Sequence, residues 1–187
     1  MINSVLKTLV LASCIAMSTS GAIAATSTVS AGGASITSRE QGMHQFQVPK
    51  GKLILINGTY QDVTTYKRSL TFYFESKPGA DWLQVPVITS ETDQDLTWFS
   101  ISQGEQTVAD AVVVPRGGTV ELVVAETKPD GPAAVAVRWY RLAEYDDEHP
   151  YGPGHYFKKI STSRYPASAK LTVEQVLKKE VTSRLNK

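Results

Sequence analysis

The segment from Arg141 to Lys159, RLAEYDDEHPYGPGHYFKK, brings carboxylates, two histidines and three tyrosines into one short stretch. These side chains suit a metal site, an acid/base site, or a loop that contacts another molecule. Hard cations prefer oxygen ligands, so Asp146 and Asp147 are the candidate ligands of one cation such as calcium or sodium. Tyrosine adds contact area at a low entropic cost. The candidate binding residues are Tyr145, His149, Tyr151, His155 and Tyr156.

Zinc is a second possibility at this segment, because it needs both histidines and a carboxylate such as Asp147 on one side. A Gly-Pro-Gly run separates His149 from His155, and it permits a turn without specifying one. A hard cation is therefore favoured over zinc, and a solvated loop without a metal is the simplest interpretation. A second acidic stretch, Glu91–Asp95, lacks the glycine and the closing glutamate of a calcium loop, so it also indicates a solvated loop.

Asp110 lies inside an apolar strand pattern, in phase with Val108 and Val112. A carboxylate in such a place must be paired or hydrogen-bonded, so we expect an arginine or backbone amides as its partner. A structural ion pair is the expected role of Asp110, and a ligand-binding role is the alternative.

Common hydrolytic motifs are missing. The Ser-x-x-Lys pattern of serine β-lactamases occurs once, at Ser4 to Lys7, within a predicted signal peptide. Neither His-Glu-x-x-His nor Gly-x-Ser-x-Gly occurs. The three histidines form a zinc site only if His44 folds onto the histidine-containing loop. We therefore expect a protein that is not an enzyme.

The N-terminus carries the features of a secretory signal: a positive start, an apolar run over Val5–Ala16, and Ala22-Ile23-Ala24 before the cleavage point. We expect cleavage after residue 24, a flexible leader over residues 25–43, and one domain over residues 44–187. The protein is then periplasmic. No later apolar run is long enough to enter a membrane. The single cysteine, Cys14, is removed with the signal, so the core must form without disulfides.

Charge is distributed unevenly along the chain. Residues 25–137 carry eight bases and twelve acids, whereas residues 138–187 carry ten bases and six acids. The net charges of the two parts cancel. A nucleic-acid-binding protein would show a much stronger basic excess. The opposite signs are compatible with self-association.

Short apolar runs between glycine and proline turns predict an all-β fold, an antiparallel β-sandwich with a short terminal α-helix. Pro86 restricts its run to an edge or bulged strand. Trp139 and Tyr140 lie on opposite faces of one strand, so we expect one in the core and the other at the surface. Turns are expected at residues 57–58, 103–104, 116–118 and 129–131. Strands are expected at residues 52–57, 70–74, 83–88, 98–102, 108–114, 120–126, 134–142 and 156–160.

The C-terminus has the pattern of an amphipathic helix. Thr172 and Gln175 have the spacing of a capping box. Apolar side chains then recur at helical spacing, which predicts packing of this stripe against the sheet. The stripe consists of Val173, Val176, Leu177, Val181 and Leu185.

Six features follow one another in order: LTFYF (70–74), LQVPV (83–87), an apolar run after Asp110, VELVVAE (120–126), RWYRL (138–142) and GPGHYF (152–157). In this order and spacing the chain resembles the carbapenem intrinsic-resistance proteins of the CarG type, from about Leu70 to the C-terminal helix. The resemblance implies a periplasmic β-sandwich, a homodimer, a bound cation and no catalytic residues.

The function that the resemblance implies is protection of a carbapenem-producing bacterium from its own antibiotic. The protein would bind the drug or shield its target, such as a penicillin-binding protein. The fold also resembles periplasmic inhibitors of invertebrate-type lysozyme, which insert a Ser-Gly-x-Tyr-like loop into the lysozyme cleft. The only Ser-Gly pair here is Ser20-Gly21, inside the signal, so lysozyme inhibition is the alternative.

Overall fold

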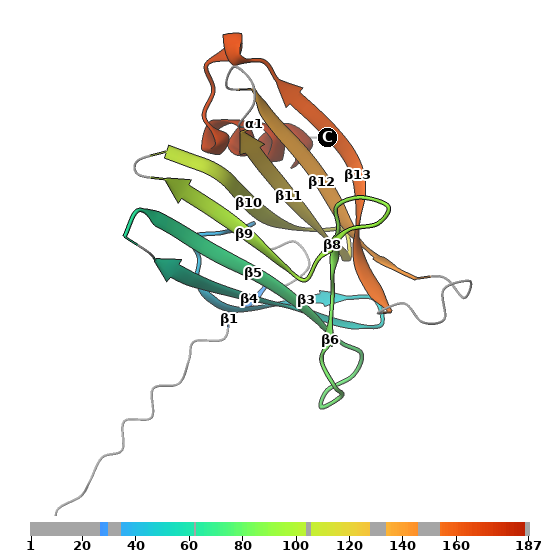
Figure 1. The fold of residues 1–187 in the computed structure, drawn as a ribbon. Helices are drawn as coiled ribbons and strands as arrows, with labels where there is room; N and C mark the ends of the chain where they lie inside the picture. The colour runs from blue at the N-terminus through green and yellow to red at the C-terminus, as the bar shows by residue number, and fades with distance from the viewer. Residues whose placement is uncertain are drawn as a thin grey trace, which may run out of the picture.

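The computed structural model describes residues 27–29, 35–61, 63–103, 106–127, 134–145 and 154–185, which form one thirteen-stranded sheet and a C-terminal helix (Figure 1). A short 3-10 turn, Ala167–Ala169, leads into α1 (Val173–Leu185). The strands are β1 (Ser27–Val29), β2 (Ile36–Thr37), β3 (Gly42–Val48), β4 (Gly51–Gln61), β5 (Thr65–Glu75), β6 (Leu83–Gln84), β7 (Val87–Ile88), β8 (Gln94–Asp95), β9 (Thr97–Gln103), β10 (Gln106–Arg116), β11 (Thr119–Thr127), β12 (Val135–Glu144) and β13 (His155–Tyr165).

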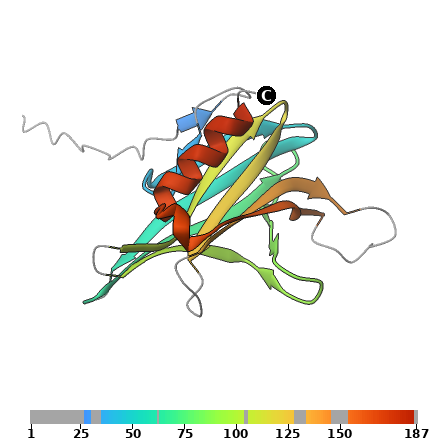
Figure 2. The same ribbon diagram turned by 90° about the horizontal axis from the view of Figure 1, so that it is seen from above.

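The sheet is continuous and mixed, in the order β1-β3-β4-β5-β9-β10-β11-β12-β13-β7-β8. The neighbours from β3 to β13 are antiparallel, whereas β1 with β3 and β7 with β13 are parallel. The predicted all-β fold with a short terminal helix is confirmed. Its strands belong to one strongly bent sheet, and the two halves face each other across the core (Figures 1 and 2).

The short segment of β6 and β7 joins the two halves of the bent sheet. The Val85 N–H donates to the Phe72 carbonyl of β5 at 2.9 Å, and the Phe157 N–H of β13 donates to the Pro86 carbonyl at 2.8 Å. Pro86 has no N–H to offer a ladder, so the strand is interrupted there. The predicted effect of this proline is therefore confirmed.

The space between the two halves is filled by the main core. Phe72 of β5 meets Phe157 of β13 edge to face, with ring centroids 4.7 Å apart. This aromatic contact connects two strands that lie five places apart in the strand order. The buried members include Phe46, Leu53, Leu55, Leu70, Phe74, Val113, Leu122, Val124 and Tyr140.

Helix α1 covers the other face of β10–β12 and creates a second core (Figure 2). Its predicted capping box forms, because the Thr172 N–H donates to Gln175 Oε1 at 3.0 Å and the Gln175 N–H donates to Thr172 Oγ1 at 3.3 Å. Trp139 belongs to this second core and Tyr140 to the main one, at 2% and 1% exposure. The prediction that one of them lies at the surface is wrong, because the helix buries the face that a single sheet layer would expose.

The turn between β10 and β11 follows the prediction. Gly117 and Gly118 both have positive φ, 54° and 80°, which is what a tight two-residue hairpin needs. Gln103 is the last residue of β9, whereas residue 104 and the turn predicted at residues 129–131 lie outside the described residues.

Asn57 and Gly58 do not end their strand, so that prediction is wrong. β4 continues through both residues and stays paired with β5. Asn57 is 2% exposed, and its Nδ2 donates to the carbonyls of Ser38 and Glu40 at 3.0 and 2.8 Å. The side-chain amide of Asn57 thus binds a backbone segment distant in sequence instead of stabilising a local turn.

Ordered structure begins before His44, so the boundary of the predicted leader needs correction. β1 and β2 both lie within residues 25–43, and Ser38 is fully buried. The polar composition of this segment suggested flexibility, but hydrogen bonds to Asn57 and Asp110 hold it against the sheet. The predicted signal peptide lies outside the described residues. Within the described residues, no helix is long and apolar enough to cross a bilayer.

Replacing Phe157 by alanine should lower the free energy of unfolding by about 3–5 kcal/mol, because it leaves a cavity between the two halves of the sheet. Phe157 is 0% exposed. Urea denaturation monitored by tryptophan fluorescence measures the change. Thr162→Ala, on the exposed part of the same strand, is the matched control and should change stability by less than about 0.5 kcal/mol. Equal effects of the two substitutions would show that this contact does not join the halves.

Candidate functional site

The candidate site lies where β12 ends and β13 begins, on either side of residues 146–153 in the sequence. The Tyr145 N–H donates to the Gly154 carbonyl at 3.0 Å and joins the two sides. We call the four residues next to this hydrogen bond the hairpin end; they are Glu144, Tyr145, His155 and Tyr156. The other predicted site residues, Asp146, Asp147, His149 and Tyr151, lie outside the described residues.

The two faces of the hairpin end carry different chemistry. Glu144 pairs with His155 and Ala143 with Tyr156, in register with the partly buried Leu142 and the buried Phe157. Side chains alternate along strands, so the carboxylate and the imidazole share the core-side face. The two tyrosines of the hairpin end lie on the opposite face.

On the core-side face, His155 is held between an aromatic ring and a carboxylate. Its imidazole stacks on Phe74, with ring centroids 3.5 Å apart and an interplanar angle of 18°. Its Nε2 lies 3.3 Å from Glu144 Oε1, and Glu144 Oε2 accepts a hydrogen bond from Lys50 Nζ at 2.7 Å. Three segments distant in sequence therefore position one imidazole.

The electrostatics of this group favour a neutral imidazole. Burial lowers the pKa of His155 below its ordinary value, and the Glu144 carboxylate opposes the shift without reversing it. The hydrogen bond from Lys50 lowers the pKa of Glu144. A neutral imidazole can both donate and accept hydrogen bonds, which suits polar ligand contacts.

A hollow of about 360 Å³ opens beside this group. It lies between the β3–β4 turn, the β10–β11 turn and the hairpin end. Its volume suits a small ligand. Its lining includes Val48, Pro49, Lys50, Thr119, Leu142, Glu144 and His155.

On the opposite face, Tyr145 and Tyr156 form an aromatic pair with ring centroids 4.2 Å apart. Burial raises the pKa of Tyr145, with Tyr156 adding to the effect. Together with the acidic segment 90–94 they line a second hollow of about 460 Å³. The structure thus places two of the predicted binding tyrosines beside the second acidic stretch of the sequence.

The acidic stretch itself is an exposed turn. Ser90 Oγ donates to Asp93 Oδ2 at 3.1 Å and accepts the Asp93 N–H at the same distance. The Asp93 carboxylate therefore acts within the turn, in agreement with the solvated-loop interpretation. Within the described residues, no three His, Cys, Asp or Glu side chains lie close enough together to hold a metal. His44 is on β3, where its Nε2 donates to the Glu40 carbonyl at 2.8 Å.

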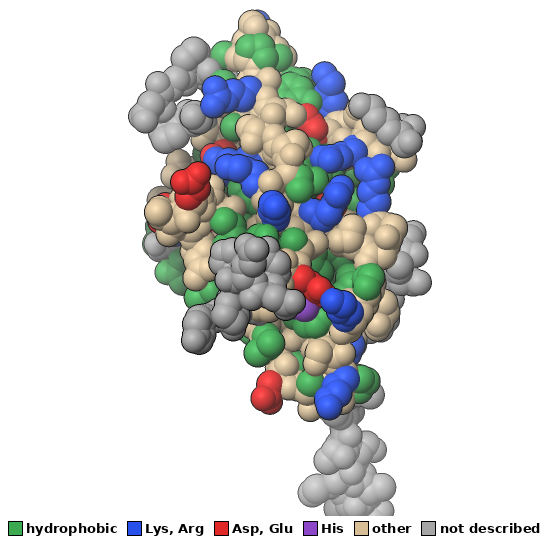
Figure 3. Space-filling model, turned by 90° about the vertical axis from the view of Figure 1, so that its right-hand side faces the viewer, with side chains coloured by type: hydrophobic (Ala, Val, Ile, Leu, Met, Phe, Trp, Pro, Cys, Tyr) green, Lys and Arg blue, Asp and Glu red, His purple; other side chains and the backbone are tan. Residues whose placement is uncertain are grey.

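Lysine and arginine side chains gather on the side of the molecule that carries β13 (Figure 3). Arg138 pairs with Glu126, and Arg141 lies 2.7 Å from the fully buried Glu121, so these two bases are neutralised locally. β13 itself carries the exposed bases Lys158, Lys159 and Arg164. Lys158 and Lys159 follow His155 by three and four positions along β13, so exposed positive charge lies near the hairpin end.

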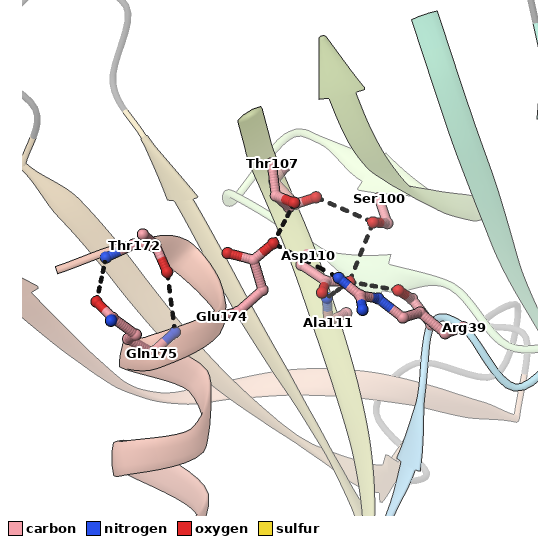
Figure 4. A network of polar contacts seen from close by, with 10 residues as sticks. Arg39, Ser100, Thr107, Asp110, Ala111, Thr172, Glu174 and Gln175 are labelled. Carbon is pink, nitrogen blue, oxygen red and sulfur yellow. Dashed lines mark hydrogen bonds and ion pairs between the residues drawn. The ribbon is translucent and has the colours of Figure 1, made fainter. Parts of the chain in front are cut away.

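Asp110 accepts hydrogen bonds from one backbone amide, as the sequence indicated, and from two serine hydroxyls, which the sequence did not indicate (Figure 4). Its Oδ1 accepts bonds from the Ser38 hydroxyl, from Ser100 Oγ at 3.0 Å and from the Ala111 N–H at 2.8 Å. The predicted ion pair is wrong, because two hydroxyls and one amide satisfy the carboxylate instead of an arginine. The serines come from segments on either side in space, which sequence spacing alone does not bring together.

Lys50 and Phe74 are members of the site that the sequence analysis missed. Each lies far from the hairpin end in sequence and shows no motif. Their roles depend on the β3–β4 turn and on the end of β5, both of which are brought to β13 only by the bend of the sheet.

Comparison with known proteins gives a likeness of fold. No protein-family model and no curated protein sequence matches the chain. A crystal structure of CarG superimposes with a TM-score of 0.56 at 18% identity, covering 73% of this chain and 94% of that one. The two proteins therefore share a fold over nearly the whole of CarG.

The pKa of His155 should lie below 6.5 in the folded protein and fall further in Glu144→Gln, because the carboxylate favours the charged imidazole. NMR titration of the imidazole protons, assigned with His155→Gln, measures both values. Because the unfolded chain binds this proton more tightly, the stability of the wild-type protein should fall as pH drops from about 6.5 through the folded pKa. Glu91→Gln is the control and should leave the titration unchanged; a rise of the pKa in Glu144→Gln would contradict the assignment.

Proposed function

We propose that this protein contributes to resistance against a carbapenem antibiotic by non-covalent binding in the periplasm. The observation that carries the proposal is the fold shared with CarG, which spans 94% of that chain. It agrees with the resemblance of the sequence to carbapenem intrinsic-resistance proteins. The function follows from both together, because a shared fold alone does not imply a shared activity.

The hairpin end is the proposed contact surface. It offers an aromatic pair on one face and a neutral imidazole beside a carboxylate on the other. A hollow adjoins each face, and their volumes of about 360 and 460 Å³ are of the order needed for a small ligand. The lysines of β13 provide positive charge nearby, which favours an anionic ligand such as the carboxylate of a carbapenem.

The proposal includes no bond breaking in the drug. His155 and Glu144 bind and orient, and the protein acts either by sequestering the antibiotic or by covering its target. A homodimer and one bound cation, both implied by the family resemblance, belong to the same proposal. Any cation would be held by Asp146 and Asp147, next to the hairpin end.

The test is carbapenem killing of a sensitive Gram-negative strain with and without this protein exported to its periplasm. The inhibitory concentration should rise severalfold for the carbapenem and remain unchanged for a second β-lactam class. A version without residues 1–24 is the control for export. No rise with confirmed periplasmic protein would overturn the proposal, and titration against invertebrate-type lysozyme would then test the alternative function.

The proposed surface is tested with the double substitution Tyr145→Ala and Tyr156→Ala, which should abolish most of the protection. Tyr60→Ala is the matched control, because this tyrosine is 61% exposed on β4, outside the hairpin end. Immunoblots of periplasmic extracts establish equal protein levels. Full protection by the double variant would place the contact surface elsewhere.

A further inference from the structure

Strand β13 has an unpaired edge that lies outside the hairpin end. β12 pairs with β13 along its whole length, from His155 to Tyr165, whereas β7 pairs with it only at Phe157. Within the described residues, no other strand borders residues 159–165 on the side away from β12. In Figure 1, the arrowhead end of β13 forms the upper right-hand border of the sheet. We call residues 159–165 the open edge.

Main-chain groups of the open edge point away from β12. The Phe157 N–H donates to the Pro86 carbonyl, so it points away from β12, and this direction alternates along a strand. The register shift between Trp139 and Tyr140 adds one residue to β13 and moves the alternation by one position. The residues whose N–H and C=O groups point outward are then Lys159, Thr162 and Arg164.

The side chains of these three residues present a single sign of charge. All three are exposed, and Lys159 and Arg164 carry positive charge on either side of the Thr162 hydroxyl. Their partners occupy alternate positions of β12, so the three side chains lie on one face of the sheet. An added strand would therefore meet two cations and one hydroxyl along this face.

The carboxylates around the open edge do not neutralise these two bases. No carboxylate of the described residues forms an ion pair with Lys159 or Arg164. Glu126 is paired with Arg138, and Glu180 accepts hydrogen bonds from two aromatic side chains of the second core. Residues 154–185 carry seven bases and two acids, and Figure 3 shows the bases on this side of the molecule. The open edge therefore keeps an excess of positive charge.

The charge of the open edge determines which strand it can accept. Exposed strand edges bind extended segments of other chains through main-chain hydrogen bonds. Antiparallel pairing of two copies about Thr162 would place Lys159 opposite Arg164 of the second copy. Like charges directly opposite each other destabilise a strand pair, so a second copy is a poor occupant. An acidic segment, in contrast, would bring opposite charges together.

We propose that the open edge binds an extended acidic segment of another protein, which adds to the sheet as a further strand beside β13. Main-chain hydrogen bonds to Lys159, Thr162 and Arg164 hold the segment. Because these residues are two strand positions apart on one face, they meet positions i, i+2 and i+4 of the segment. The matching segment has acidic residues at i and i+4 and a small polar residue at i+2. The open edge lines neither hollow of the hairpin end, so this interaction is separate from the proposed binding of a carbapenem.

The test is fluorescence anisotropy of a labelled nine-residue peptide with a Glu-Thr-Ser-Thr-Glu core flanked by threonines. The wild-type protein should bind it saturably. Glutamine in place of both glutamates should weaken binding about fivefold, because each exposed charge pair contributes little. Two further versions carry N-methyl groups at alternate residues, along one edge of the peptide or the other. Only the version that lacks the donors facing β13 should lose binding, and equal binding of the two would overturn strand addition.

Thr162→Pro removes an N–H that points away from β12, so the ladder with β12 should persist while the open edge loses a donor. Binding of the acidic peptide should fall about tenfold or more. Circular dichroism and thermal unfolding establish that the variant folds. Unchanged peptide binding by the folded variant would refute the site.

The charge argument is tested separately with the double variant Lys159→Glu and Arg164→Glu. It should lose the acidic peptide and gain binding of a version with lysines in place of the glutamates. Lys67→Glu with Lys77→Glu, on and after β5, makes the same charge change elsewhere and is the matched control. Failure of the reversed edge to prefer the lysine peptide would contradict the proposal. A fall in the sedimentation coefficient of the wild-type protein on adding the acidic peptide would show that a second copy occupies the edge, which would overturn the choice of partner.

Discussion

The structure depends on a junction inside the sheet, at Asp110. Along one edge, β10 pairs with β9 from Gln106 to Ala109, with a register shift between Thr107 and Ala109, and then with the short strand β2 at Val112 and Val113. A carboxylate at the changeover binds a hydroxyl from each of the two partners. A buried charge costs free energy unless it is hydrogen-bonded, so the sequence can keep an aspartate here only because both serines converge on it. This junction also holds the segment after β2 against the sheet, through the hydrogen bond from Ser38.

The bend of the sheet determines where chemistry can occur. It brings the β3–β4 turn, the end of β5 and the β12–β13 hairpin to one edge of the main core. His155 contacts residues from two of these segments, because its ring stacks on Phe74 while its nitrogen faces Glu144. The two faces of the hairpin end differ in chemistry because strand side chains alternate.

Local patterns predicted the local structure well. The strands, the hairpin at Gly117 and Gly118 and the capping box of α1 all depend on residues close in sequence. The failures concern partners distant in sequence. Asn57 resembled a turn residue, but it binds carbonyls nearly twenty positions earlier. Asp110 was expected to pair with an arginine or with backbone amides; it binds one amide and two serine hydroxyls, one of them 72 positions away.

The candidate site shows the same division between local and distant information. Tyr145, His155 and Tyr156 were predictable because the segment is rich in polar and aromatic side chains. Lys50 and Phe74 were not, since nothing near either residue marks it as a neighbour of an imidazole. The double burial of Trp139 and Tyr140 likewise required knowing that α1 returns to cover the second face of β12.

The ends of the strand order bear on how the molecule behaves at high concentration. The long strands β4, β5 and β10–β13 lie in the interior of the order, while its ends are the three-residue β1 and the two-residue β8. Unpaired edges recruit other chains into intermolecular sheets, and short or charged edges resist this. Gln94 and Asp95 of β8 are both exposed, so the edge beyond β13 ends in a polar, two-residue strand. A chain without disulfide bonds thus limits aggregation through the order of its strands.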